Sequence, residues 1–138
     1  MIGLDTSVVL RLLIGEPVAE SEAAQALLAE VAAANERCHL HDLVVAESWH
    51  ALRAHYGVPD VEAARALLLL VDDPVIVASP AARQALAAVS NVAVGNTGGA
   101  GFMDRLIHAA YEGHGHIFAT FDRKAGKLPG ARLLRGGR

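Results

Sequence analysis

The order of hydrophobic segments along the chain is the feature that most constrains its fold. Short apolar runs alternate with longer segments in which apolar residues recur with the period of a helix, and this alternation is typical of α/β proteins. The short runs predict five strands, at residues 1–4, 38–41, 75–77, 117–120 and 132–134. The longer segments predict six helices, at residues 8–14, 20–33, 43–55, 60–71, 81–89 and 103–111.

Strands joined by helices in this order predict a three-layer α/β/α fold. Its centre would be a mostly parallel sheet of about five strands, with right-handed crossovers and helices on both faces. Residues 1–138 are expected to form a single domain, because this length suits one hydrophobic core and the sequence contains no repeat. The glycine-rich stretch 91–101 predicts a loop.

Local residues mark the predicted starts of several helices. Asp42 is a candidate N-cap, because a short polar side chain there can accept a hydrogen bond from the first helical turn. Pro59 and Pro80 come just before helical segments, where a missing N–H costs little.

Charge is distributed unevenly over a chain whose net charge is −3. Residues 123–138 contain six basic and no acidic side chains, whereas the preceding 122 residues contain six basic and fifteen acidic ones. This basic C-terminal segment suits a phosphate backbone or an acidic segment of a partner protein. A solvated tail without a binding role is the alternative.

Three features bear on the compartment of the protein. Cys38 is the only cysteine, so no disulfide can form within the chain. No apolar run reaches the roughly 18 residues that a membrane span requires. The first four residues contain no basic side chain and are followed directly by Asp5, whereas a secretory signal begins with a basic segment. We therefore expect a cytoplasmic protein that does not engage a membrane.

Four acidic residues are placed where a parallel sheet binds ligands, at the carboxyl ends of its strands. Asp5 ends the first predicted strand, and Asp122 follows the fourth. Glu47 lies about one turn into the third predicted helix, and Asp104 opens the last one. A single parallel sheet would bring all four to one edge. Turns and the first turn of a helix also favour Asp5, Asp122 and Asp104 for structural reasons, whereas Glu47 interrupts an apolar helix face.

A cluster of carboxylates has a definite chemistry. Oxygen-only ligands favour a hard cation, Mg²⁺ or Mn²⁺, and a buried carboxylate needs such a partner. A metal of this kind supports attack of water on phosphorus. The predicted cluster therefore indicates metal-dependent hydrolysis of a phosphodiester.

At these acids the chain resembles the PIN-domain family, and particularly the VapC-like toxins of bacterial toxin–antitoxin pairs. The matching segments are IGLDTSVVL at 2–10, VVAESW at 44–49, GFMDRLI at 101–107 and ATFDR at 119–123. The resemblance implies a PIN-like fold and an endoribonuclease that depends on Mg²⁺ or Mn²⁺. It also implies a homodimer that is inhibited by a cognate antitoxin protein.

The same resemblance assigns roles to individual residues. It implies four catalytic and metal-binding acids and two supporting hydroxyls, namely Asp5, Glu47, Asp104, Asp122, Thr6 and Thr120. Two positions depart from the usual pattern. Ser7 stands where many relatives have Asn, which would change a contact behind the site. Arg105 stands where a small residue is usual, and we expect it to pair with the site acids or to reach phosphate.

The basic C-terminal segment supplies candidates for binding RNA. Three cationic residues directly follow Asp122 and are expected to hold the RNA backbone, namely Arg123, Lys124 and Lys127. Three others lie further along and are expected to face the antitoxin or solvent, namely Arg132, Arg135 and Arg138. Trp49 is expected in the core, because only six aromatic residues are present and no run of them has an exposed pattern.

Two other functions remain open. Asp5 could be the nucleophile of a phosphatase, but such enzymes require a second acid two residues later, where this chain has Ser7. A non-catalytic PIN-like binding module could use the acids to dock a basic partner, but such a module has no reason to keep all four. Metal-dependent turnover separates these possibilities.

Overall fold

The computed structural model describes residues 1–91 and 99–136, and every predicted strand and helix is present in it. In chain order the elements are β1 (Ile2–Gly3), α1 (Thr6–Ile14), α2 (Val18–Ala33), β2 (Cys38–Leu40), α3 (Asp42–Ala54), α4 (Asp60–Val71), β3 (Ile76–Ala78), α5 (Pro80–Ser90), α6 (Phe102–Gly113), β4 (Ala119–Thr120), the short 3-10 helix η2 (Ala125–Lys127) and β5 (Arg132–Leu133). Residues 92–98, most of the predicted glycine-rich loop, lie outside the described residues.

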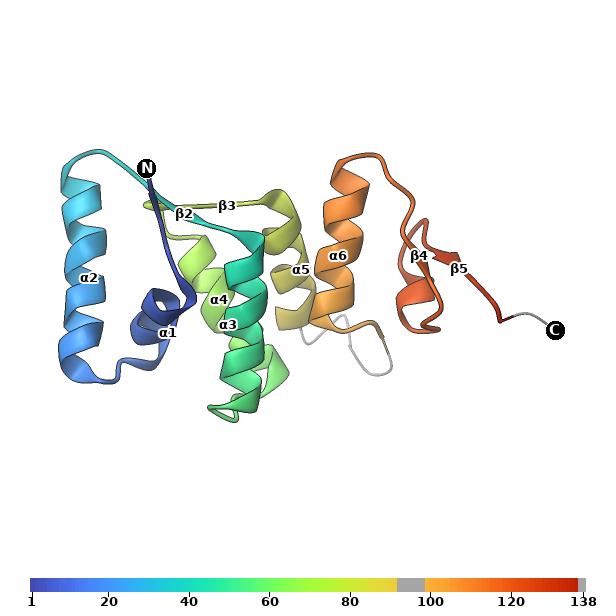
Figure 1. The fold of residues 1–138 in the computed structure, drawn as a ribbon, viewed down its shortest axis with the longest axis horizontal. Coiled ribbons are helices and arrows are strands. Elements are labelled where there is room, and N and C mark those ends of the chain that lie inside the picture. Colours follow the sequence, from blue (N-terminus) through green and yellow to red (C-terminus); the bar gives the residue numbers. More distant parts are fainter. Residues whose placement is uncertain (92–98, 137–138) are drawn as a thin grey trace.

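The prediction of one sheet of about five strands is wrong. Strands β1, β2 and β3 form one parallel sheet in that order, and β4 and β5 form a separate parallel pair. Figure 1 shows β4 and β5 beyond α6, with α5 and α6 standing between them and the three-stranded sheet. The alternation of strands and helices predicts the elements but not their pairing. Here α6 packs beside α5 and carries the chain away from β1.

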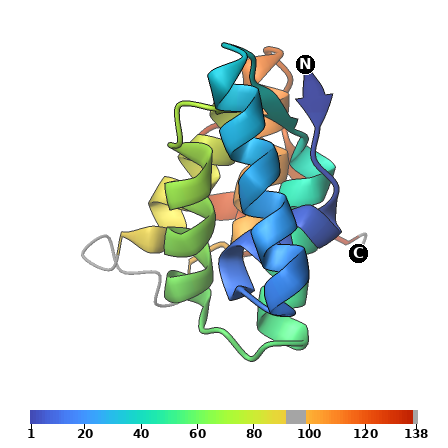
Figure 2. The same cartoon turned by 90° about the vertical axis from the view of Figure 1, so that its left-hand side faces the viewer.

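The helices pack through aliphatic side chains, and the one tryptophan joins two of them. Figure 2 shows α2 in front, with α4 on one side of it and α3 on the other. Trp49 of α3 is 3% exposed, and its ring lies 4.7 Å from that of Phe102 at the start of α6. The predicted core position of Trp49 is therefore confirmed.

Burial raises the pKa of the Cys38 thiol, and the nearby Asp73 carboxylate raises it further.

Local hydrogen bonds explain where α3 and α5 begin. The N-cap of α3 is His41, whose Nδ1 accepts a hydrogen bond from the Leu43 amide at 3.0 Å. The prediction of Asp42 as N-cap is wrong, because Asp42 is already helical and accepts a hydrogen bond from the Ser79 hydroxyl at 2.6 Å. Ser79 in turn caps α5, of which Pro80 is the first residue.

The prediction that Pro59 marks the start of a helix is confirmed. Pro59 is in the N-cap position immediately before α4, with extended backbone angles. Its missing N–H costs little there, since the first helical amides have no partner within the helix. Over the described ranges 1–91 and 99–136, no helix is long and apolar enough to cross a membrane.

Candidate active site

Asp5 links β1 to α1 and presents its carboxylate to solvent. The residue is exposed, and its Oδ2 accepts a hydrogen bond from the Ser7 hydroxyl at 3.0 Å. The unusual Ser7 therefore contacts the acid directly. Thr6 is 8% exposed, and its buried Oγ1 has no hydrogen-bond partner among the described residues. The predicted supporting hydroxyl thus lies behind Asp5 without an assigned bond.

Glu47 is exposed on α3, so the expectation that it is buried on an apolar face is wrong. Leu43, one turn earlier on the same face, is 74% exposed. Ala54 on that face is also exposed, whereas Ala51 is buried, so most of the face points to solvent. The buried residues of α3 are Val45, Ser48, Trp49, Ala51 and Leu52.

Asp104 lies half-buried in the first turn of α6, next to an arginine that fixes this end of the helix. The Nε of Arg105 donates a hydrogen bond to the carbonyl oxygen of Ala100 at 2.9 Å. Arg105 therefore supports the segment that leads into α6. Its expected contact with phosphate or with the site acids remains a prediction.

Asp122 follows β4 and organises the turn after it. Its Oδ1 accepts hydrogen bonds from the backbone amides of Lys124 at 2.7 Å and Ala125 at 3.0 Å. Its own amide donates to the Thr120 hydroxyl at 3.0 Å. Thr120 therefore holds the backbone of the acid, and its supporting role in catalysis remains a prediction. Asp122 itself is exposed.

The structure brings the elements of three of the acids together and separates the fourth. Helix α1, which Asp5 precedes, packs against α3, and the Trp49–Phe102 contact places the start of α6 beside α3. Asp122 belongs to the other sheet, and Figure 1 shows β4 far along the molecule from the start of α1.

The described acids are not gathered into a group of three or more metal ligands. Throughout the described part of the chain, no three His, Cys, Asp or Glu side chains are grouped so that they could hold a metal ion. The expected convergence on one edge depended on β1 and β4 sharing a sheet, which they do not. We therefore assign no reaction step to a metal in this arrangement.

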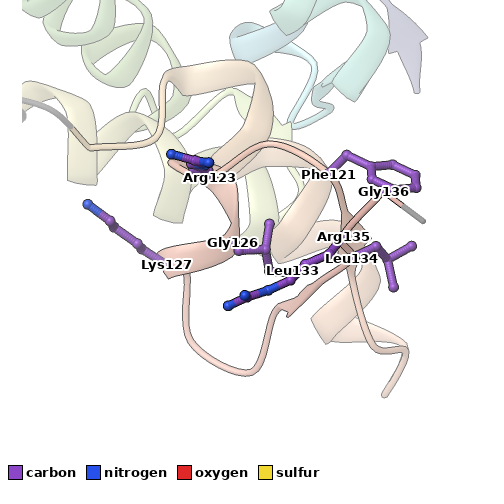
Figure 3. Close-up of a pocket in the computed structure, with 8 residues that line it drawn as sticks. All are labelled: Phe121, Arg123, Gly126, Lys127, Leu133, Leu134, Arg135 and Gly136. Carbon is purple, nitrogen blue, oxygen red and sulfur yellow. The ribbon is translucent and has the colours of Figure 1, made fainter. Parts of the chain in front are cut away.

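A basic pocket of about 580 Å³ lies between β4, η2 and β5 (Figure 3), and its lining includes both chain neighbours of Asp122 but not Asp122 itself. Its lining includes Arg123 and Lys127, which were predicted to hold RNA, Arg135, which was expected to face the antitoxin or solvent, and Phe121, for which no role was predicted. Lys124 is exposed but does not line the pocket. The parallel pairing of β4 with β5 brings the segments around residues 121 and 135 side by side. The local sequence carries no signal for this pairing, so it could not predict the full lining of the pocket.

Comparison with known proteins gives one match. The family model of the PIN domain matches residues 2–131, nearly the whole chain. The matched range contains all four acids, whereas Arg135 lies beyond it. No curated protein and no solved structure matches the chain significantly.

Proposed function

This chain belongs to the PIN domain family, and from that premise we propose that it hydrolyses RNA phosphodiester bonds. PIN domains are generally nucleases, which act as hydrolases on nucleic acids. Within that class we propose an endoribonuclease that requires Mg²⁺ or Mn²⁺, with Asp5, Glu47, Asp104 and Asp122 as its acids. Metal dependence and the set of four acids are proposed from the family and from the oxygen-only donors, because no three of the described acids are grouped as metal ligands and Asp122 lies apart from the other three.

The observation that carries the proposal is an exposed carboxylate, that of Asp122, whose chain neighbours Phe121 and Arg123 both line a cationic pocket. Asp122 is fixed through Thr120 and through two backbone amides, so its position is defined before any substrate arrives. Arg123 and Lys127 of the pocket carry charges that attract a phosphate backbone. A negatively charged polymer would thereby be drawn to an acid that could not attract it alone.

We further propose that the protein is the toxin of a toxin–antitoxin pair, acting in the cytoplasm as a homodimer. A row of apolar side chains on α6 supports a protein partner, because Met103, Ile107 and Tyr111 recur every four residues. They are 40%, 41% and 47% exposed. An apolar stripe of this kind is typical of a surface that another protein covers.

The test is cleavage of single-stranded RNA by the purified chain with EDTA, Mg²⁺ or Mn²⁺. We expect cleavage only with a divalent cation, and a loss on the order of 100-fold or more in Asp5→Asn and Asp122→Asn. Asp60→Asn is the matched control, because Asp60 is an exposed acid of α4 that pairs with Arg53. Its activity should equal that of the wild type.

Other outcomes would favour the remaining functions. Hydrolysis of a phosphate monoester with RNA left intact would support the phosphatase with Asp5 as nucleophile. Full RNA cleavage by both Asp5→Asn and Asp122→Asn would show that these acids are not catalytic. No turnover of either substrate with any cation would favour a binding module.

A further inference from the structure

The pocket beside Asp122 is built by the backbone of the C-terminal sheet. The Leu134 amide donates to the Thr120 carbonyl at 2.7 Å, and the Gly126 amide donates to the Asp122 carbonyl at 2.8 Å. A Cβ on Gly126 would lie 3.0 Å from Cδ1 of Leu133, so a side chain there would push β5 away from η2. The wall of the pocket is therefore set by hydrogen bonds and by a close approach that glycine permits.

The lining of this pocket is cationic without compensating acids. Arg123, Lys127 and Arg135 line it, and no acidic residue does. Among the residues that the structure describes, none of these three forms an ion pair, whereas Arg11, Arg53 and Arg83 each have an acidic partner. The three unpaired charges repel one another unless an anion lies among them.

An aromatic ring lies at the other side of the same pocket. Phe121 is 69% exposed, so the ring of one of only six aromatic residues in the chain is accessible to a ligand. In the view of Figure 3 the ends of Arg123 and Lys127 lie on the left and the Phe121 ring lies on the right. Phosphate-binding groups and a flat apolar surface are therefore presented together.

We propose that this pocket binds single-stranded RNA, with a base stacked on Phe121 and backbone phosphates held by Arg123, Lys127 and Arg135. The pocket volume is within the range of small-ligand sites, roughly 300–1,000 Å³. Only an unpaired base can offer its face to a side chain, so the ring selects single strands over duplex. An acidic peptide would satisfy the three charges but would leave the ring without a stacking partner.

This inference rests on the proposed function, because it names how the substrate of that reaction is held. Asp122 comes between two lining residues, Phe121 and Arg123, in the chain, although it does not line the pocket itself. The pocket would hold the strand whether or not the bond is then cut. Binding and cleavage can therefore be tested apart.

The experiment measures the affinity of the full chain for a fluorescent single-stranded RNA oligonucleotide in EDTA, across a salt series. All proteins carry Asp5→Asn to prevent cleavage. We expect Phe121→Ala to weaken binding about 5- to 100-fold without changing the salt dependence. Replacing Arg123, Lys127 and Arg135 together by Ala should weaken binding more than 10-fold. It should also reduce the slope of log affinity against log salt by about 2, since each single-strand phosphate contact contributes about 0.7.

The matched control is Arg132→Ala, which removes an exposed charge from β5 at a position that does not line the pocket. It should bind RNA within about 2-fold of the parent protein, as expected for loss of at most one weak phosphate contact. Phe121→Ala should leave any weak binding to duplex RNA unchanged. Circular dichroism of each variant checks that the fold is retained.

Several outcomes would overturn the inference. It is wrong if Phe121→Ala and the triple variant bind RNA as tightly as the parent protein, even when the wild type cleaves RNA with Mn²⁺. It is also wrong if polyglutamate binds as well as RNA and Phe121→Ala has no effect, since the pocket would then be a general anion site. Selective RNA binding through the pocket by a protein that never cleaves RNA would instead refute the proposed function alone.

Discussion

At the scale of single residues, Asp122 holds its own turn together while its side chain stays exposed. Oδ1 accepts two backbone hydrogen bonds, so part of the carboxylate is used in structure. A turn role for this acid and a catalytic role were both expected from the sequence. The geometry establishes the turn role, and the catalytic role is the one proposed above.

Two substitutions at Asp122 separate these roles. Asparagine keeps a carbonyl oxygen that can accept both amide hydrogen bonds, whereas alanine removes the acceptor. We expect Asp122→Ala to lower the free energy of unfolding by about 1 kcal/mol and Asp122→Asn to lower it by less than about 0.5 kcal/mol. Both should lose RNA cleavage. Urea denaturation and a cleavage assay measure the two effects, and an active Asp122→Asn protein would limit the residue to its turn.

At the scale of elements, the starts of α3 and α5 are joined by one serine. The Ser79 hydroxyl accepts from the Ala82 amide at 3.0 Å as N-cap of α5 and donates to Asp42 in the first turn of α3 at 2.6 Å. The two residues are 37 positions apart in the chain. One side chain therefore sets where one helix begins and how it lies against another.

Replacing this serine should cost more than replacing an ordinary helical serine. We expect Ser79→Ala to lower the free energy of unfolding by about 1–2 kcal/mol, because both the cap and the bond to Asp42 are lost. Ser90→Ala is the control, since among the described residues the Ser90 hydroxyl donates to the Ala87 carbonyl of its own helix. That change should cost less than about 0.5 kcal/mol. Equal losses in the two variants would show that the Ser79–Asp42 bond contributes nothing.

At the scale of the whole molecule, the contact between Trp49 and Phe102 connects the first half of the chain to its C-terminal part. Phe102 is 1% exposed and begins α6, which leads to the second sheet and the basic pocket. Its ring packs on α3 with a centroid distance of 4.7 Å. The position of α6, and so of the chain that follows it, depends on this packing.

Two phenylalanines provide a matched test of that dependence. Phe102→Ala should lower the free energy of unfolding by about 3–5 kcal/mol, because it leaves a cavity against Trp49. Phe121→Ala removes the same atoms from an exposed position and should cost less than about 0.5 kcal/mol. Urea denaturation followed by the fluorescence of Trp49 measures both changes. Similar losses would contradict the assigned burial of the two rings.

The sequence alone determined the strands, the helices, the family and the order of the four acids. Apolar periodicity specifies helices and strands because it depends on neighbours a few residues apart. The same local signals identified Pro59 before α4. They failed at Asp42, because the ring nitrogen of His41 takes the capping role that an acid usually has.

Only the tertiary structure decided which strands pair and which side chains are exposed. Strand pairing depends on segments far apart in the chain, and β4 pairs with β5 while β1 pairs with β2. Glu47 is exposed because α3 packs through another face, which the pattern around Glu47 could not reveal. Phe121 and Arg135 line one pocket for the same reason, since the pairing of β4 with β5, and not the local sequence around either residue, brings these two parts of the chain side by side.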